Sequence, residues 1–90
     1  MKAVNIRVSG KVQGVFFRES AKQMADELGL TGFVRNEPNG SVYIEAEGEE
    51  ASIEKFVAWC KEGPEHAKPD AVTSSRQPLS DFEGFRVEGR

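Results

Sequence analysis

The spacing of apolar residues changes abruptly near the start of the chain, from a strand pattern to a helix pattern. Val4, Ile6 and Val8 alternate with polar residues, which is the period-two pattern of a strand that buries one face. After a break at residues 10–14, the apolar positions counted from Phe17 fall at offsets of 0, 4, 7, 8 and 11, one stripe of an amphipathic helix. A strand that passes through so short a turn into a helix restricts the chain to folds built from βα units.

The rest of the chain predicts further elements of both kinds. Gly29 lies where a left-handed residue ends the first helix, and Gly63-Pro64 ends a second one. In chain order, the predictions are a strand at residues 31–36, a hairpin turn at 37–40, a strand at 41–47, a helix at 48–60, a polar loop at 65–70, a weak strand at 72–77 and a short terminal strand at 85–87. The turn prediction rests on Glu-Pro-Asn-Gly, because Pro presets φ and both Asn and Gly tolerate positive φ.

This order is βαββαβ, with a small fifth strand at the end. Right-handed crossovers then place both helices on one face of an antiparallel sheet, which is the ferredoxin-like α/β sandwich of the α+β class. The first and third strands are expected at its centre. A chain of 90 residues is long enough for one domain, so residues 1–90 are predicted to form a single domain. The fold alone does not indicate the function, because it hosts many.

Composition excludes several classes of function. The chain has 12 Lys and Arg against 15 Asp and Glu, and this net charge of −3 argues against nucleic-acid binding. No apolar run approaches the roughly 18–20 residues of a membrane helix, and no signal peptide is expected. The single cysteine, Cys60, and single histidine, His66, exclude a disulfide within the chain and a Cys/His zinc cluster. We expect a cytoplasmic monomer without metal, cofactor, membrane or nucleic-acid partner.

The segment from Gly10 to Arg18 is the first candidate site. Two glycines in a five-residue turn let backbone N–H groups converge, and the helix that follows adds partial positive charge. Arg18 at the start of that helix adds a bidentate donor for the same anion. The motif is neither a Walker A loop nor a dinucleotide fingerprint. On spacing alone, an alternative stays open in which the glycines only form a tight turn and Arg18 is a solvated helix residue.

The end of the second predicted strand is another candidate. In a split βαβ order, Asn36 can come to lie beside the loop that follows the first strand. A carboxamide there can both donate to and accept from a water molecule. The alternative is that Asn36 merely precedes a turn, where asparagine is common.

Two long segments resemble the signatures of the acylphosphatase family. The first is Gly10-Lys11-Val12-Gln13-Gly14-Val15-Phe16-Phe17-Arg18, and the second is Leu28-Gly29-Leu30-Thr31-Gly32-Phe33-Val34-Arg35-Asn36, followed after a turn by Gly40-Ser41-Val42. The resemblance covers nearly the whole chain. It departs from the family pattern at Ala21, where many members carry a hydroxyl residue, and at Phe33, which replaces a common tryptophan.

The resemblance implies a fold, an activity and a set of site residues. The fold is the ferredoxin-like sandwich, and the activity is hydrolysis of an acyl phosphate, a small-molecule substrate, to carboxylate and inorganic phosphate. Carried over by position, Arg18 would bind the phosphoryl group, Asn36 would orient the attacking water, and Ser41 would support the asparagine by a hydrogen bond. The backbone amides expected to assist Arg18 are those of Lys11, Val12, Gln13, Gly14, Val15 and Phe16.

Hydrolysis of an acyl phosphate can be catalysed by as few groups as an arginine, an asparagine and a set of backbone amides. The leaving carboxylate has a pKa near 4, so it needs no general acid. Because phosphoryl transfer has a loose transition state, positioning and charge stabilisation do most of the work, without a covalent nucleophile or a metal. Two alternatives stay open: a non-catalytic module that senses phosphate or another anion, and an RNA-binding domain of the same topology. Negative charge and the absence of an aromatic platform on the first and third strands argue against the latter.

Overall fold

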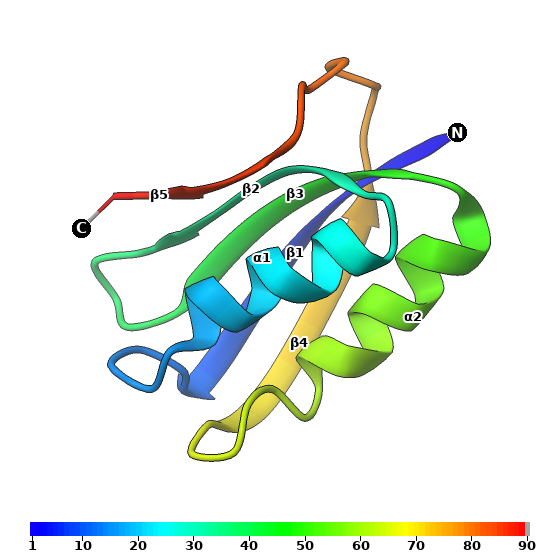
Figure 1. The fold of residues 1–90 in the computed structure, drawn as a ribbon. Helices are drawn as coiled ribbons and strands as arrows, with labels where there is room; N and C mark the ends of the chain where they lie inside the picture. The colour runs from blue at the N-terminus through cyan, green and yellow to red at the C-terminus, as the bar shows by residue number, and fades with distance from the viewer. Residues whose placement is uncertain (90) are drawn as a thin grey trace.

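Five strands form one sheet, and two helices lie across one of its faces (Figure 1). The computed structural model describes residues 1–89. Its elements are β1 (Lys2–Lys11), α1 (Phe17–Glu27), β2 (Thr31–Asn36), β3 (Val42–Gly48), α2 (Glu50–Cys60), β4 (Lys68–Arg76) and β5 (Phe85–Glu88). The strand order across the sheet is β4-β1-β3-β2-β5, which confirms β1 and β3 as the central strands. The ferredoxin-like fold predicted above is therefore observed.

The sheet is mixed, which corrects the prediction that all its strands are antiparallel. β1 pairs antiparallel with both β3 and β4, and β3 pairs antiparallel with β2. β5 pairs parallel with β2, with Gly32 opposite Phe85. The reason is geometric. β4 runs in the direction opposite to β2, so a chain that reverses after β4 and crosses to the far edge arrives parallel to β2.

The core lies between the sheet and the helices. Alternate residues of the central strands face the helices, and Ile6 on β1 lies directly opposite Ile44 on β3. Both side chains are fully buried. The helices contribute the expected stripes to the same core, namely Phe17, Ala21 and Ala25 from α1 and Ile53, Phe56 and Cys60 from α2. Gly29 adopts φ 73°, and the Leu30 N–H donates to the Ala25 carbonyl, so α1 ends in the predicted left-handed cap.

β4 begins earlier and runs longer than predicted. Residues 65–70 were expected to be a loop, but β4 starts at Lys68, which pairs with Lys11. β4 is an edge strand whose side chains are mostly exposed, so its sequence lacks the apolar alternation that marks a half-buried strand. Its pairing with the last residues of β1 extends the sheet beneath the loop that leads to α1. Within residues 1–89, no helix is long and apolar enough to cross a membrane.

Candidate active site

The loop of residues 12–16 connects β1 to α1 at one end of the sheet. Its backbone turns through the left-handed region at Gly14, with φ 74°, and again at Phe16, with φ 63°, where α1 is capped. Among the backbone hydrogen bonds of residues 1–89, none uses the N–H of Gly14, Val15 or Phe16 as its donor. Alternation of left- and right-handed residues forms concave arrays of N–H groups that bind anions. The loop therefore carries backbone donors that are available to an anion.

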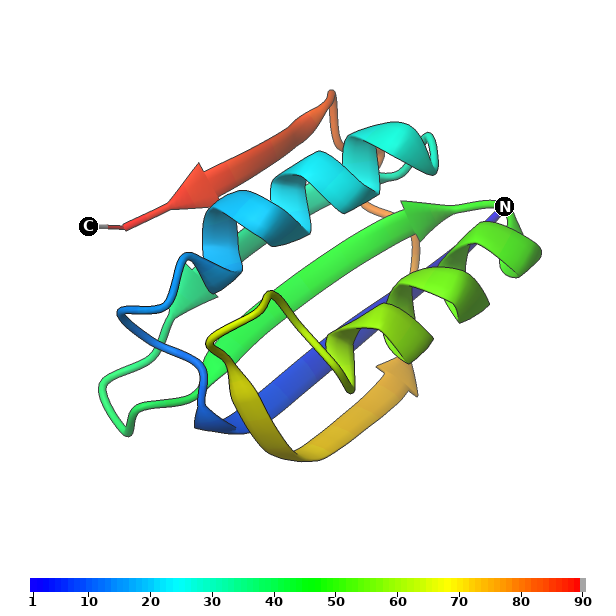
Figure 2. The ribbon, with the colours of Figure 1, turned by 60° about the horizontal axis from the view of Figure 1, so that its bottom comes forward.

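Two contacts hold this loop in place. Val12 and Val15 are buried and pack into the core. The Gln13 side chain reaches across to the β2–β3 turn, where its Nε2 donates to the Glu37 carbonyl at 2.9 Å and to the Ser41 carbonyl at 2.8 Å. Figure 2 shows the loop and this turn side by side at the same end of the sheet. Gln13 was expected to contribute a backbone amide, and its side-chain contacts were not anticipated.

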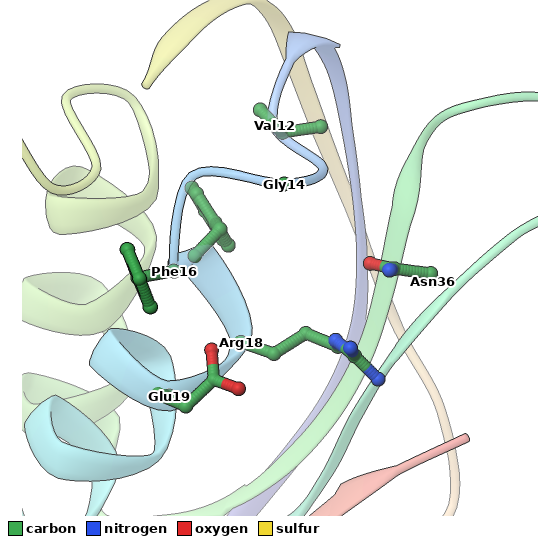
Figure 3. Close-up of a pocket in the computed structure, with 7 residues that line it drawn as sticks. Val12, Gly14, Phe16, Arg18, Glu19 and Asn36 are labelled. Carbon is green, nitrogen blue, oxygen red and sulfur yellow. The ribbon is translucent and has the colours of Figure 1, made fainter. Parts of the chain in front are cut away.

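Arg18 lies in the first turn of α1 and is half-buried. Its Nη1 donates to the Glu88 carbonyl of β5 at 2.8 Å, which ties the guanidinium to the edge of the sheet. Figure 3 shows the guanidinium extending from the helix toward Asn36. A guanidinium has five N–H donors in a fixed fork, so one bond to a carbonyl leaves others for an anion. β5 thus orients Arg18.

Asn36 is the last residue of β2. Its Oδ1 is buried, and within residues 1–89 no group donates a hydrogen bond to it. A buried acceptor without a partner costs about 1–3 kcal/mol, so native proteins rarely keep one. Figure 3 shows the amide end of Asn36 directed into the space between Arg18 and the loop. This oxygen is positioned to accept a hydrogen bond from something that enters that space.

A pocket of about 290 Å³ brings these groups together. Its lining residues are Val12, Gly14, Phe16, Phe17, Arg18, Glu19 and Asn36. Of the residues predicted from the sequence, Val12, Gly14, Phe16, Arg18 and Asn36 line it, whereas Lys11, Gln13 and Val15 do not. The Phe16 ring is 74% exposed at the rim. The pocket combines a guanidinium, a carboxamide and a glycine-containing loop, and groups of these kinds can bind an anion and a water molecule.

Ser41 lies in the β2–β3 turn, and its hydroxyl does not make the expected hydrogen bond to the Asn36 Oδ1, which has no donor within residues 1–89. The Ser41 Oγ donates to Asn39 Oδ1 at 2.6 Å, and the Ser41 N–H donates to the same oxygen at 3.0 Å. The reason is register: Asn36 pairs with Val42, so Ser41 lies one residue beyond the last paired position. Ser41 instead supports the turn through its carbonyl, which accepts from the Glu37 N–H at 2.8 Å as well as from Gln13.

The remaining candidate groups lie outside the pocket. Cys60 is buried on the core face of α2, and burial raises the pKa of its thiol to about 12, which keeps it protonated and unreactive. Within residues 1–89, no group of three or more His, Cys, Asp or Glu side chains is arranged to hold a metal ion. The charged and polar side chains that line the pocket are those of Arg18, Glu19 and Asn36.

Comparisons with known proteins point to one family. The profile of the acylphosphatase family matches residues 4–87. An acylphosphatase of Marinobacter nauticus is 51% identical over 84 residues, covering 92% of this chain and 91% of the relative. The solved structure of an acylphosphatase from Coxiella burnetii has a TM-score of 0.94 at 44% identity, covering 97% of this chain and 92% of that one. The crystal structure of an acylphosphatase from Bacillus subtilis has a TM-score of 0.96 at 33% identity, covering 99% of this chain and 100% of that one.

Proposed function

Since the chain belongs to the acylphosphatase family, we propose that this pocket hydrolyses the carboxyl–phosphate bond of small acyl phosphates, with Arg18 and Asn36 as its catalytic residues. The observation that carries the assignment is the buried Asn36 Oδ1, which has no hydrogen-bond donor within residues 1–89 and belongs to the pocket that Arg18 also lines. The Asn36 Oδ1 can accept a hydrogen bond from a water molecule, and the Arg18 guanidinium can hold a phosphoryl group next to that water.

Arg18 and the loop bind the phosphoryl group. The guanidinium fork matches two phosphoryl oxygens, and charge-assisted bonds of this kind are among the strongest in proteins. The backbone N–H groups of residues 11–16, together with the N-terminal end of α1, take up the remaining negative charge. Because these donors are fixed before the substrate arrives, they stabilise the charge on the transferring group without reorganisation.

Asn36 positions the nucleophile. Its Oδ1 accepts a hydrogen bond from a water molecule, which leaves a water lone pair directed at phosphorus. The water oxygen forms the new bond to phosphorus while the bond from phosphorus to the acyl oxygen breaks, and the carboxylate departs with that electron pair. A water proton passes to the phosphate product or to solvent. Since the leaving carboxylate has a pKa near 4, no general acid is required.

The test is phosphate release from acetyl phosphate in the presence of EDTA. The wild-type protein should release phosphate, and Arg18→Ala should lower kcat/KM by about a thousandfold because it removes the charged fork. Arg18→Lys is the matched control, since it keeps the charge and loses the bidentate geometry, and it should retain intermediate activity. Asn36→Ala should lower kcat while competitive inhibition by inorganic phosphate persists.

Other outcomes would reject specific parts of the proposal. Full activity in a folded Arg18→Ala protein would remove Arg18 from the mechanism. A large loss of phosphate affinity in Asn36→Ala would make Asn36 a binding residue. Phosphate binding without hydrolysis of any acyl phosphate by the wild-type protein would favour the alternative, a phosphate-sensing module.

We also propose that the chain is a single domain that acts as a cytoplasmic monomer and binds neither nucleic acid nor membrane. A single cysteine whose thiol is buried in the core fits a reducing compartment. A net charge of −3 disfavours binding to a phosphate backbone. Light scattering after size-exclusion chromatography tests the monomer, and a mass of twice 9.9 kDa would overturn it.

A further inference from the structure

The side chain of Gln13 makes contacts that the proposed chemistry does not require. Its Nε2 carries two hydrogens, and two backbone carbonyls accept from it, those of Glu37 at 2.9 Å and Ser41 at 2.8 Å. Both bonds are partly buried, which protects them from competition with water. An amide nitrogen has only two donors, so this side chain is committed to the β2–β3 turn.

The two acceptors stand at the two sides of one turn. Glu37 follows Asn36 directly, and the Ser41 carbonyl also accepts from the Glu37 N–H at 2.8 Å. The Gln13 amide therefore holds the point where β2 leaves the sheet, one peptide away from Asn36. Within residues 1–89, these are the side-chain hydrogen bonds that join residues 12–16 to the turn.

Val12 and Val15 anchor the loop to the core, and Gln13, which lies between them, joins the loop to the β2–β3 turn. The Asn36 Oδ1 has no hydrogen-bond donor within residues 1–89, so side-chain bonding does not hold that oxygen in position. The loop reverses at Gly14, and glycine does not restrict its own backbone. The distance between the bound phosphoryl group and the water thus depends in part on the Gln13 bridge between the loop and the end of β2.

We propose that Gln13 is a positioning residue that holds the phosphoryl-binding loop at a set distance from Asn36. The proposal rests on the function proposed above for Arg18 and Asn36. Loss of the bridge lets the turn move relative to the loop, so the water no longer lies in line with the bond that breaks. In oriented reactions, a displacement of about 1 Å costs roughly a hundredfold in rate.

The first test is Gln13→Met, which keeps the length of the side chain and removes its donors. With acetyl phosphate, kcat should fall about tenfold or more, because water and phosphorus lose their alignment. The inhibition constant of inorganic phosphate should change by less than about threefold, because the loop amides and Arg18 remain. A role in folding alone would lower the melting temperature and leave the kcat of the folded enzyme unchanged.

Gln77→Met is the matched control. Gln77 also bridges two groups through its amide, since its Nε2 donates to Glu45 at 2.9 Å and its Oε1 accepts from Asn5 at 3.0 Å. It follows β4 and lies outside the residues that line the pocket. This variant should lose stability as Gln13→Met does and keep the wild-type kcat. Equal kcat values in the two variants would overturn the proposal.

The second test asks whether Gln13 acts through Asn36. In an Asn36→Ala background, assayed at micromolar enzyme, Gln13→Met should lower kcat by less than about twofold. The reason is that Asn36→Ala has already removed the acceptor that orients the water. The same fold-loss in both backgrounds would overturn the proposal. If Gln13→Met does not fold, Gln13→Asn, which shortens the reach by one carbon, replaces it. A wild-type protein that does not hydrolyse acetyl phosphate would refute the proposed function instead.

Discussion

Polar oxygen atoms are buried at opposite ends of the β2–β3 pair, those of the Glu47 carboxylate and the Oδ1 of Asn36, and their surroundings differ. The carboxylate of Glu47, 2% exposed at the end of β3, accepts from the Ser80 N–H and, at 3.0 Å, from the Asp81 N–H. The Oδ1 of Asn36, at the end of β2, has no donor within residues 1–89. The first group is satisfied by the protein and fastens a loop, whereas the second is open toward a pocket. A buried polar atom without a partner is thus the better marker of function.

Among the variants that test this contrast between Asn36 and Glu47, Asn36→Ala gives the largest expected effect on activity. It should lower kcat for acetyl phosphate by about a hundredfold, because the water loses its acceptor. The free energy of unfolding should stay the same or rise by up to about 1 kcal/mol, because the variant removes an acceptor that was buried without a bond. Urea denaturation and phosphate release measure the two quantities. A clear loss of stability would mean that Asn36 has a structural partner after all.

Glu47→Ala should show the reverse. Removing the carboxylate leaves two N–H groups of the loop before β5 without an acceptor, so the free energy of unfolding should fall by about 2 kcal/mol. The kcat measured well below the melting temperature should stay within about twofold of wild type, since the pocket lies at the other end of the pair. A large drop in kcat would show that Glu47 also supports catalysis, and the distinction between a structural Glu47 and a functional Asn36 would then be wrong.

Cys60 sharpens the comparison, because its thiol is a weak donor and can be buried without a partner at little cost. Burial raises the pKa of this thiol to about 12. A raised pKa in the folded state contributes stability that is complete below about pH 9 and is lost as the pH rises toward 12. By pH 10, the free energy of unfolding should have fallen by on the order of 1 kcal/mol from this group. Urea titrations at pH 8 to 10.5 should show a smaller slope in Cys60→Ala; equal slopes would contradict the assignment.

Ser41→Ala has the smallest expected effect. Its hydroxyl donates to Asn39 in the turn, and within residues 1–89 no group donates to the Asn36 Oδ1, so kcat should fall by no more than about threefold. The same phosphate-release assay measures it, with Asn39→Ala as the partner variant that removes the other end of the bond. A loss as large as that of Asn36→Ala would restore the direct support of Asn36 that the family resemblance implies.

Most of the fold follows from periodicity in the sequence. The alternation of Val4, Ile6 and Val8 marks β1, and the stripe from Phe17 marks α1, because both elements bury one face and expose the other. The first residues of β4 could not be predicted in this way, since an edge strand with exposed side chains needs no apolar alternation. The parallel pairing of β5 is likewise invisible locally, because it depends on which edge the chain reaches after β4.

The site divides in the same way. Residue type and position make Arg18 and Asn36 candidates, the family resemblance assigns their roles, and both residues line one pocket. The bonds of Gln13 could not be predicted, because both acceptors are main-chain carbonyls and any residue supplies a carbonyl. The hydrogen-bond partner of the Ser41 hydroxyl depends on the pairing of β2 with β3, because a shift of one residue changes which side chains are neighbours. A pattern of residue types does not determine that register.

The bond from Arg18 to the Glu88 carbonyl has a consequence for how the enzyme is made. A ribosome delivers the glycine loop, the arginine and the asparagine before it delivers β5, the strand that orients the arginine. A nascent chain halted before β5 would hold the parts of a phosphoryl site with its cation unanchored. In the mechanism proposed above, turnover therefore requires β5 to dock, so the onset of turnover reports the moment at which β5 joins the sheet.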